Sequence, residues 1–158
     1  MRRLRLRAET GSRSRLGGKR GHGLLVTRET DYALRVLRVL SGGEQVTTKQ
    51  ICDRELLPQQ FVYKIIKRLN RAGIVSIARG AAGGCRLTAD LTKISLYDLI
   101  RVMDADSLVS ECTQPCYRCG AQEKRGRPCG TNRQLRQIQD VLDGELKKRS
   151  LADMLCDE

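Results

Sequence analysis

The chain has no Trp, a single Phe and only four Tyr among 158 residues. Without aromatic side chains, any core has to be packed from aliphatic residues. It also has one histidine, His22, which lies in an Arg-rich N-terminal stretch. The mixed Cys–His zinc sites and the His-based nucleophile pairs are therefore excluded from the rest of the chain.

Long apolar runs are also missing. No segment has the about 18 consecutive apolar residues of a membrane span, and the N-terminus lacks the apolar region of a secretory signal. We therefore expect a cytoplasmic protein without a membrane partner. In that compartment the seven cysteines are not expected to form disulfides, and four of them fall within residues 112–129, which favours metal or redox chemistry.

Positive charge is what the chain has in excess. It carries 30 Lys and Arg against 18 Asp and Glu, a formal net charge of +12, which favours a polyanionic partner. Residues 1–24 hold eight of these basic residues and one Glu, which leaves about +5 for residues 25–158. We expect residues 1–24 to be a disordered basic arm, or a start assigned upstream of the true one, since regular patterning begins at Leu25.

The segment 57–73 is predicted to be a helix with one apolar face and one purely basic face. Its apolar residues recur with the i, i+3, i+4, i+7 spacing of a helix; they are Val62, Ile65, Ile66 and Leu69. Pro58 suits the first helical position and Gly73 a helix end. The remaining face holds four Lys and Arg and no acid, a pattern that fits a nucleic acid.

Two helices are expected before this segment, and a hairpin after it. The first runs from Thr27 or Arg28 to Leu40, and Thr47 with Gln50 opens the second as a capping box. Residues 74–78 and 85–88 predict two strands joined by the turn RGAAGG at 79–84. A helix-turn-helix followed by such a hairpin is a winged helix, whose third helix reads the major groove while the wing contacts the minor groove or phosphates. The candidate DNA contacts are Gln59, Gln60, Tyr63, Lys64, Lys67, Arg79 and Arg86.

Beyond the wing, the pattern predicts mainly helix. A connecting helix capped by Ser95 lies in residues 93–110, and a long amphipathic helix begins at Thr131 within the final region, 131–158. Its apolar positions are Leu135, Ile138, Leu142 and Leu146. A second copy of the chain would cover this stripe and suit palindromic DNA; the alternative is that the helix packs back on its own domain, residues 25–92. The expected fold class is mainly α with a small β-hairpin wing, a winged helix-turn-helix plus a long C-terminal dimerisation helix.

The cysteine-rich stretch, residues 111–130, has the pattern Cys112-x3-Cys116-x2-Cys119-x9-Cys129. Gly, Pro and charged residues between the cysteines predict a loop without a core of its own. Thiolates select zinc, copper(I) or iron–sulfur clusters. The spacing leaves three chemistries open: a structural zinc on the four cysteines, an iron–sulfur cluster, or bare redox-active thiols.

Several of these motifs together resemble one family. The start TDYALR at 30–35, the helix at 58–69, the wing RGAAGG and the cysteine-rich loop before a long helix occur in the order typical of the Rrf-type winged-helix transcriptional regulators, of the IscR and NsrR kind. The resemblance covers residues 25–158. It implies a homodimer that binds double-stranded DNA at a pseudo-palindromic operator, with contacts at Gln60, Tyr63, Lys64 and Arg79.

The resemblance also implies a cofactor. Three loop cysteines of cluster-binding members ligate an iron–sulfur cluster, and Cys112, Cys119 and Cys129 match them with longer gaps than the family's usual five residues. The fourth ligand is expected to be Cys116, or Asp31 of the other subunit. The cluster would be 2Fe–2S or 4Fe–4S, and its redox, nitric-oxide or iron–sulfur status would set operator affinity.

Two alternatives to this hypothesis stay open. One keeps the DNA-binding fold but assigns the cysteines to redox-active thiols or to zinc, with a different signal. The other is a cysteine-based metal-transfer or redox enzyme, which the sequence disfavours because residues 25–158 contain no evident nucleophile–base pair. We therefore expect a regulator and no catalytic residues.

Overall fold

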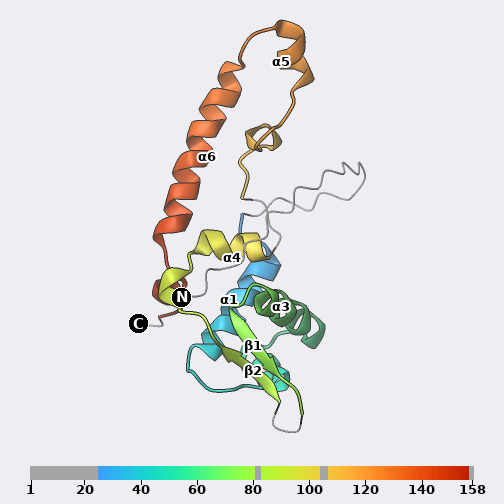
Figure 1. The fold of residues 1–158 in the computed structure, drawn as a ribbon, viewed down its shortest axis with the longest axis vertical. Coiled ribbons are helices and arrows are strands. Elements are labelled where there is room, and N and C mark those ends of the chain that lie inside the picture. Colours follow the sequence, from blue (N-terminus) through green and yellow to red (C-terminus); the bar gives the residue numbers. More distant parts are fainter. Residues whose placement is uncertain (1–24, 81–82, 104–106, 157–158) are drawn as a thin grey trace.

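The computed structural model describes residues 25–80, 83–103 and 107–156, so the predicted N-terminal arm lies outside the described part. The predicted fold class is confirmed, because the described residues form helices and one two-stranded antiparallel hairpin. Figure 1 shows a helical body with the hairpin at one end, and the long helix α6 extending from the opposite side of that body.

The helix-turn-helix has the expected order and boundaries. Its helices are α1 (Arg28–Leu40), α2 (Thr48–Glu55) and α3 (Gln59–Arg71). The predicted capping box is present, with Thr47 and Gln50 each accepting a hydrogen bond from the other's backbone N–H. One detail differs from the prediction. Pro58 is the N-cap residue of α3, with an extended ψ of 129°, and not its first helical residue, so the helix begins one residue later, at Gln59.

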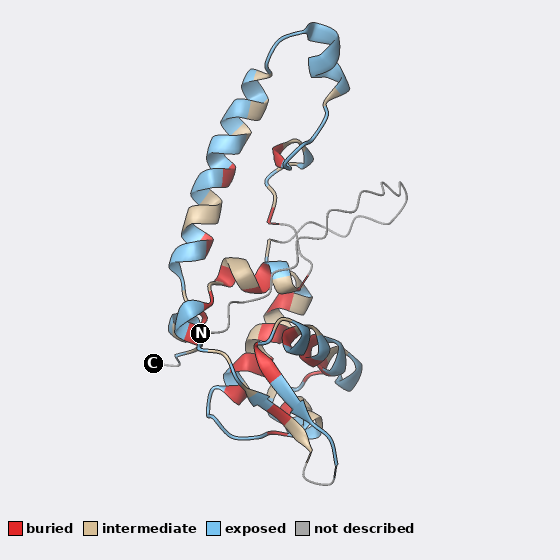
Figure 2. Ribbon diagram, in the orientation of Figure 1, coloured by how far each residue is buried: buried red, intermediate tan, exposed pale blue. Residues whose placement is uncertain are grey.

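The core is aliphatic, as the composition requires. The four predicted apolar residues of α3 are all buried and belong to one core cluster with the apolar residues of α1; Figure 2 colours buried residues red. The buried residues of α1 include Ala33, Val36, Leu37 and Leu40. Cys85 of the wing joins the same cluster, where its thiol donates to the carbonyl of Val46 at 3.3 Å.

The wing consists of β1 (Val75–Ala78) and β2 (Gly84–Leu87), paired so that Ser76 faces Arg86. Val46, just before α2, forms an isolated bridge with Cys85 and so fastens the hairpin to the helix-turn-helix. A Cβ at Gly84 would lie 2.8 Å from the Val46 carbonyl oxygen, so this close pairing requires glycine. The wing is therefore a fixed part of the body.

The C-terminal half contains more helix than the sequence suggested. Its elements are η1 (Leu91–Lys93), α4 (Leu96–Val102), η2 (Glu111–Thr113), α5 (Gly120–Arg125), α6 (Gly130–Lys148) and α7 (Leu151–Leu155). The expectation of a plain loop at 111–130 is wrong, because η2 and α5 form there and Gly126 ends α5 with a φ of 62°. After α6 the chain turns back, and Leu151 at the start of α7 is buried in the core. The Leu151 N–H donates to the Ile94 carbonyl at 2.8 Å.

The predicted stripe of α6 is covered at one end only. Leu146 is buried against Leu96 and Ile100 of α4, so this end packs back on the chain's own body. Farther along the stripe, Ile138 is 53% exposed, and the neighbouring Val141, which the predicted stripe did not include, is 69% exposed. This half of the helix leaves apolar surface uncovered within one chain.

Leu56, at the corner between α2 and α3, predicts a stabilising substitution. It adopts the left-handed conformation (φ 53°, ψ 43°), and its side chain is 89% exposed. Left-handed backbone costs an L-residue about 1–2 kcal/mol, while glycine adopts it freely at an entropic cost of about 0.5–1 kcal/mol. We therefore expect Leu56→Gly to raise the free energy of unfolding by about 0.5–1 kcal/mol in urea denaturation. Leu56→Ala is the control, because it keeps the backbone strain; an equal gain from Ala would contradict this explanation.

Candidate nucleic-acid interface and cysteine site

The outer face of α3 carries the candidate base-reading side chains. All five predicted contacts on this helix are exposed, and they are Gln59, Gln60, Tyr63, Lys64 and Lys67. The Gln59 side-chain amide donates to the Tyr63 hydroxyl at 3.3 Å, which orders the first turn of this face. Amide, phenol and ammonium groups on one exposed helix face are the chemistry that reads base edges and phosphates.

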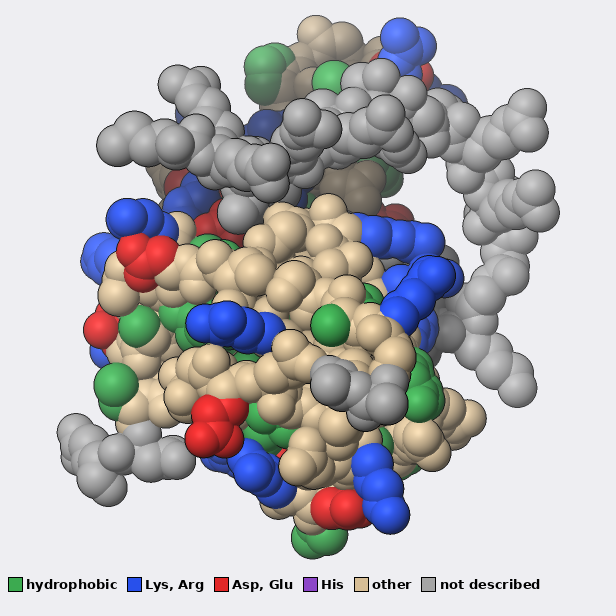
Figure 3. All heavy atoms as spheres, turned by 60° about the horizontal axis from the view of Figure 1, so that its bottom comes forward, with side chains coloured by type: hydrophobic (Ala, Val, Ile, Leu, Met, Phe, Trp, Pro, Cys, Tyr) green, Lys and Arg blue, Asp and Glu red, His purple; other side chains and the backbone are tan. Residues whose placement is uncertain are grey.

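The wing adds two exposed arginines. Arg79 directly follows β1 and Arg86 lies on β2, and both are exposed. In Figure 3, which brings the wing end of the molecule forward, Lys and Arg side chains are spread over this face among polar surface and a few acidic groups. The structure therefore places every predicted DNA contact on exposed surface of α3 or the hairpin.

One acidic residue on this side was not anticipated from the sequence. Glu29, in the first turn of α1, accepts from the Lys64 ammonium at 2.5 Å and from the Arg68 guanidinium at 2.7 Å. The same nitrogen of Arg68 also donates to the carbonyl oxygen of Met103 at 2.6 Å. In the sequence, Glu29 is simply an acid in the first turn of a helix, where it suits the helix dipole. No local pattern signals a pair that spans 35 residues.

At the far end of the molecule, Asn132 connects two of the predicted cysteine ligands. Cys112 lies in η2 and Cys129 caps the start of α6. The side-chain amide of Asn132 donates to the Cys112 carbonyl at 2.6 Å, and Arg136 donates to the Asn132 side-chain oxygen at 3.1 Å. The Ser110 hydroxyl lies 3.4 Å from the Cys112 thiol.

Polar neighbours favour the thiolate forms of Cys112 and Cys129. The side chains of Ser110 and Asn132 lower the pKa of Cys112, and the backbone N–H of Asn132, followed by that of Thr131, lowers the pKa of Cys129. Burial has the opposite effect on Cys85, whose thiol pKa is raised. Thiolates are the forms that bind metal and react with oxidants, so Cys112 and Cys129 have the character expected of ligands or redox thiols.

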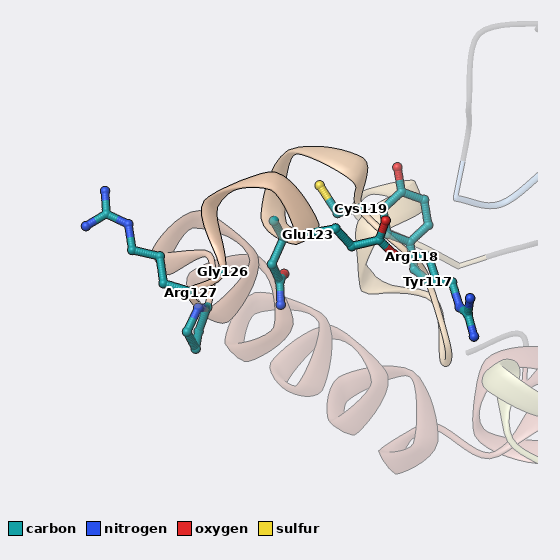
Figure 4. A pocket seen from close by; sticks show the side chains of 8 residues that line it. Tyr117, Arg118, Cys119, Glu123, Gly126 and Arg127 are labelled. Atoms are coloured by element: carbon teal, nitrogen blue, oxygen red, sulfur yellow. The ribbon is translucent and has the colours of Figure 1, made fainter.

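The other predicted ligands lie apart from this pair. Cys119 caps α5 and lines a surface hollow of about 340 Å³ together with Tyr117 and Glu123 (Figure 4). Cys116 is exposed with a positive φ of 64°, and Asp31, on α1, pairs with Arg35 at 3.1 Å. Among the residues that the structure describes, no three thiol, carboxylate or imidazole groups lie close enough to hold one metal ion.

Comparison with known proteins identifies the family. Residues 26–157 match the Rrf2 family model, described as an iron-dependent transcriptional regulator. The chain belongs to the Rrf2 family of transcriptional regulators. It is 36% identical over 90 residues to the regulator NsrR of Bacillus subtilis (strain 168), covering 55% of this chain and 62% of that protein. The repressor NsrR of Streptomyces coelicolor is 29% identical over 137 residues, 83% of this chain and 88% of the repressor.

Solved structures agree with this assignment. The T. potens IscR structure superposes with a TM-score of 0.62 at 25% identity, covering 84% of this chain and 87% of that chain. The oxidised form of Staphylococcus aureus CymR, at 20% identity and a TM-score of 0.61 over 84% of this chain and 98% of that one, shares the fold. The chain spans 58% and 62% of the lengths of the first two curated relatives, Protein aau3 of Rhizobium meliloti (strain 1021) and the B. subtilis NsrR.

Family membership decides between two of the sequence hypotheses. Rrf2 proteins are transcriptional regulators, so the hypothesis of a cysteine-based enzyme is rejected, and the expectation that the chain is not an enzyme is confirmed. In the described part of this Rrf2 regulator, no helix is long and apolar enough to span a bilayer.

A buried glutamine attaches the cysteine segment of this Rrf2 regulator to α6. Gln139 accepts from the N–H of Val109 at 2.7 Å and donates to the carbonyl of Ser107 at 2.8 Å. It also donates to the Asp143 carboxylate at 2.7 Å. Sequence analysis missed Gln139 because a polar residue beside an apolar stripe is normally solvent-facing.

Proposed function

We propose that this Rrf2 regulator is a cytoplasmic homodimer that binds a pseudo-palindromic operator and changes its affinity with the state of a cysteine-ligated iron–sulfur cluster. The observation that carries the proposal is the combination of two surfaces in one chain. One is the exposed face of α3 with its winged hairpin. The other is formed by the thiolate-favouring cysteines Cys112, in η2, and Cys129, at the start of α6.

The DNA-reading role follows from the chemistry of α3. Gln59 and Gln60 can each pair with an adenine edge in the major groove, where all four base pairs are distinguishable. Lys67 adds a phosphate contact next to them, and the wing residues Arg79 and Arg86 extend the contact to the backbone or minor groove. These residues are exposed in the structure and so are accessible to DNA.

Dimerisation follows from the uncovered part of α6. Exposed Ile138 and Val141 lie about one helical turn apart, so they form one apolar strip that a second copy of the helix can cover. A two-fold axis along such a helix pair would present two α3 helices to two half-sites. The operator is accordingly expected to be a pseudo-palindrome.

The cysteine site fits an iron–sulfur group in its donor chemistry. Cys112, Cys119 and Cys129 would hold the group, with Cys116 or the partner's Asp31 as fourth ligand, and thiolates are its usual ligands. When bound, the group would supply sensitivity to redox state, nitric oxide or iron–sulfur status. Asn132 donates to the Cys112 carbonyl and its backbone N–H lowers the pKa of Cys129, which supports the assignment.

The link from this site to DNA runs through α6. Gln139 hydrogen-bonds the segment that leads into Cys112, so reordering of the loop acts on the helix proposed to form the dimer. A small rotation of the two subunits about that interface would change the distance between their two α3 helices. Because half-site spacing is fixed by DNA geometry, such a change alters operator affinity.

The test is anaerobic purification followed by visible absorption, iron, acid-labile sulfide and zinc analysis, and titration of operator DNA in each state. A brown protein containing iron and sulfide, with an operator affinity that changes on exposure to nitric oxide or oxygen, is the expected result. A colourless protein with one zinc per chain would instead make the loop structural. A protein that stays metal-free after reconstitution would remove the cluster from the proposal.

One observation favours a second candidate, in which the bare thiols are the sensor. Hydrogen bonding lowers the pKa of both Cys112 and Cys129, and this is the condition for selective oxidation. In that case the metal-free protein would lose or gain operator affinity on mild oxidation and regain the original value with dithiothreitol. The cluster hypothesis predicts no such reversible change in metal-free protein.

Arg79→Ala provides a separate test of the wing. We expect it to weaken binding to operator and unrelated duplex by similar factors, and to lower the slope of log K against log salt by about 1, as loss of one phosphate contact does. Fluorescence anisotropy across a salt series measures both quantities. The control, Lys148→Ala, removes the same charge from α6, and an equal effect there would show that net charge alone is responsible.

A further inference from the structure

The basic face of α3 is partly neutralised from outside the helix. Its segment contains Lys64, Lys67, Arg68 and Arg71 and no acid, yet Glu29 of α1 forms ion pairs with Lys64 and Arg68. Two of the four cations on the reading helix therefore share one carboxylate that belongs to a different element. This arrangement places a negative charge next to the surface expected to meet phosphate.

The two ion pairs of Glu29 are not equivalent. Arg68 is 20% exposed and its bridging nitrogen also donates to the Met103 carbonyl at the end of α4, so its guanidinium is held from two sides. Lys64 is 52% exposed and sits on a flexible stem, with its ammonium 2.5 Å from the Glu29 carboxylate. Of the two cations, Lys64 is the one free to rotate toward a DNA phosphate.

We propose that Glu29 is a positioning residue that competes with DNA phosphate for Lys64 and thereby limits the affinity of the protein for DNA. The inference rests on the proposed DNA-binding function and identifies a residue that limits the affinity for DNA. Arg68 anchors the carboxylate in place, while Lys64 exchanges between the carboxylate and phosphate.

The physical basis is the modest strength of exposed ion pairs. An exposed Lys–carboxylate pair is weak and easily exchanged, so Glu29 does not prevent a phosphate contact by Lys64. It does reduce the net free energy that the phosphate contact contributes, because the Lys64 ammonium must break its ion pair with Glu29 before it can bind the phosphate. The carboxylate also repels any phosphate that approaches Lys64. Both effects lower the number of counterions that binding releases, which is measured by the salt dependence of affinity.

The test is Glu29→Gln, measured by anisotropy on operator and unrelated duplex across a salt series. We expect binding about 5–10-fold tighter at ~0.1 M salt on both duplexes, with a salt slope steeper by up to about 1, the effect of one additional phosphate contact. Glu29→Asp keeps the charge and should stay close to wild type. Glu145→Gln is the matched control, because it removes the same charge and a 2.5 Å pair with Lys148 on α6.

A double-mutant cycle with Lys64→Met separates positioning from a general charge effect. We expect Lys64→Met to weaken DNA binding more in the Glu29→Gln background than in the wild type, since only there is Lys64 fully available. Equal losses in the two backgrounds, or unchanged affinity and slope in Glu29→Gln, would overturn the inference. Glu29→Ala serves as the second variant where Glu29→Gln is unstable, as judged by its melting temperature.

The outcomes distinguish this inference from the function on which it rests. A wild-type protein that binds neither operator nor unrelated DNA would reject the proposed function itself. Binding by the wild type together with no effect of Glu29→Gln or Glu29→Ala would reject only the role of Glu29.

Discussion

Cys119→Ala is expected to abolish the difference in operator affinity between the two states of the cysteine site while leaving the affinity of the cluster-free protein unchanged. Cys119 is an expected ligand but lies at the start of α5, which is remote from α3 and the wing (Figure 1), so its thiol has no direct contact with DNA. Allosteric coupling is typically about 5–150-fold in affinity, and the variant should bring that ratio to about 1. Operator titrations of anaerobically reconstituted and nitric-oxide-treated protein measure the ratio.

Cys156→Ala is the control for this experiment. Cys156 is exposed after α7 and stands outside the cysteine segment, so its removal should leave both the cluster content and the affinity ratio at wild-type values. Normal state-dependent binding by Cys119→Ala would remove Cys119 from the sensing site. Comparison of Cys116→Ala with Asp31→Ala in the same assay assigns the fourth ligand, because only loss of the true ligand changes the absorption spectrum of the bound cluster.

The parts of the fold that follow local rules were predictable. Helix caps such as Thr47–Gln50 and Ser95–Asp98 depend on residues three positions apart, and a single stripe of aliphatic residues defines the buried side of α3. The hairpin follows from a β-branched run at 74–78 and a short second run at 85–88 around a Gly-rich turn. Each of these features is specified within a short stretch of sequence, and the structure contains each of them.

The features that depend on distant contacts were not predictable. The pair of Glu29 with Lys64 joins two helices far apart in sequence, and the hydrogen bonds of Gln139 join α6 to a segment about 30 residues earlier. Neither has a periodicity or spacing that a single sequence displays. The cysteine spacing likewise identifies donor atoms but not their arrangement, because α5 forms between Cys119 and Gly126, where composition suggested a loop.

Gln139→Ala is expected to release the segment leading into Cys112 from α6. The side chain is buried and satisfies the N–H of Val109 and the carbonyl of Ser107, so truncation leaves two polar groups without their partner. Loss of such partners costs roughly 2–3 kcal/mol, which corresponds to about 30–160-fold faster exchange of the Val109 amide hydrogen. Because the core of α1 and α3 does not involve Gln139, the melting temperature should change little. Hydrogen exchange followed by mass spectrometry or NMR measures the local effect.

The matched control is Gln137→Ala, which makes the same chemical change at an exposed position on the same helix. It should leave the exchange rate at Val109 unaltered. If the proposed route from the cysteine site through α6 holds, Gln139→Ala also reduces the response of operator affinity to cluster state while iron and sulfide content stay at wild-type levels. A variant with faster exchange at Val109 but an unchanged response of operator affinity to cluster state would contradict the proposed route. Gln139 would then order the segment before Cys112, and the signal would reach α3 without Gln139.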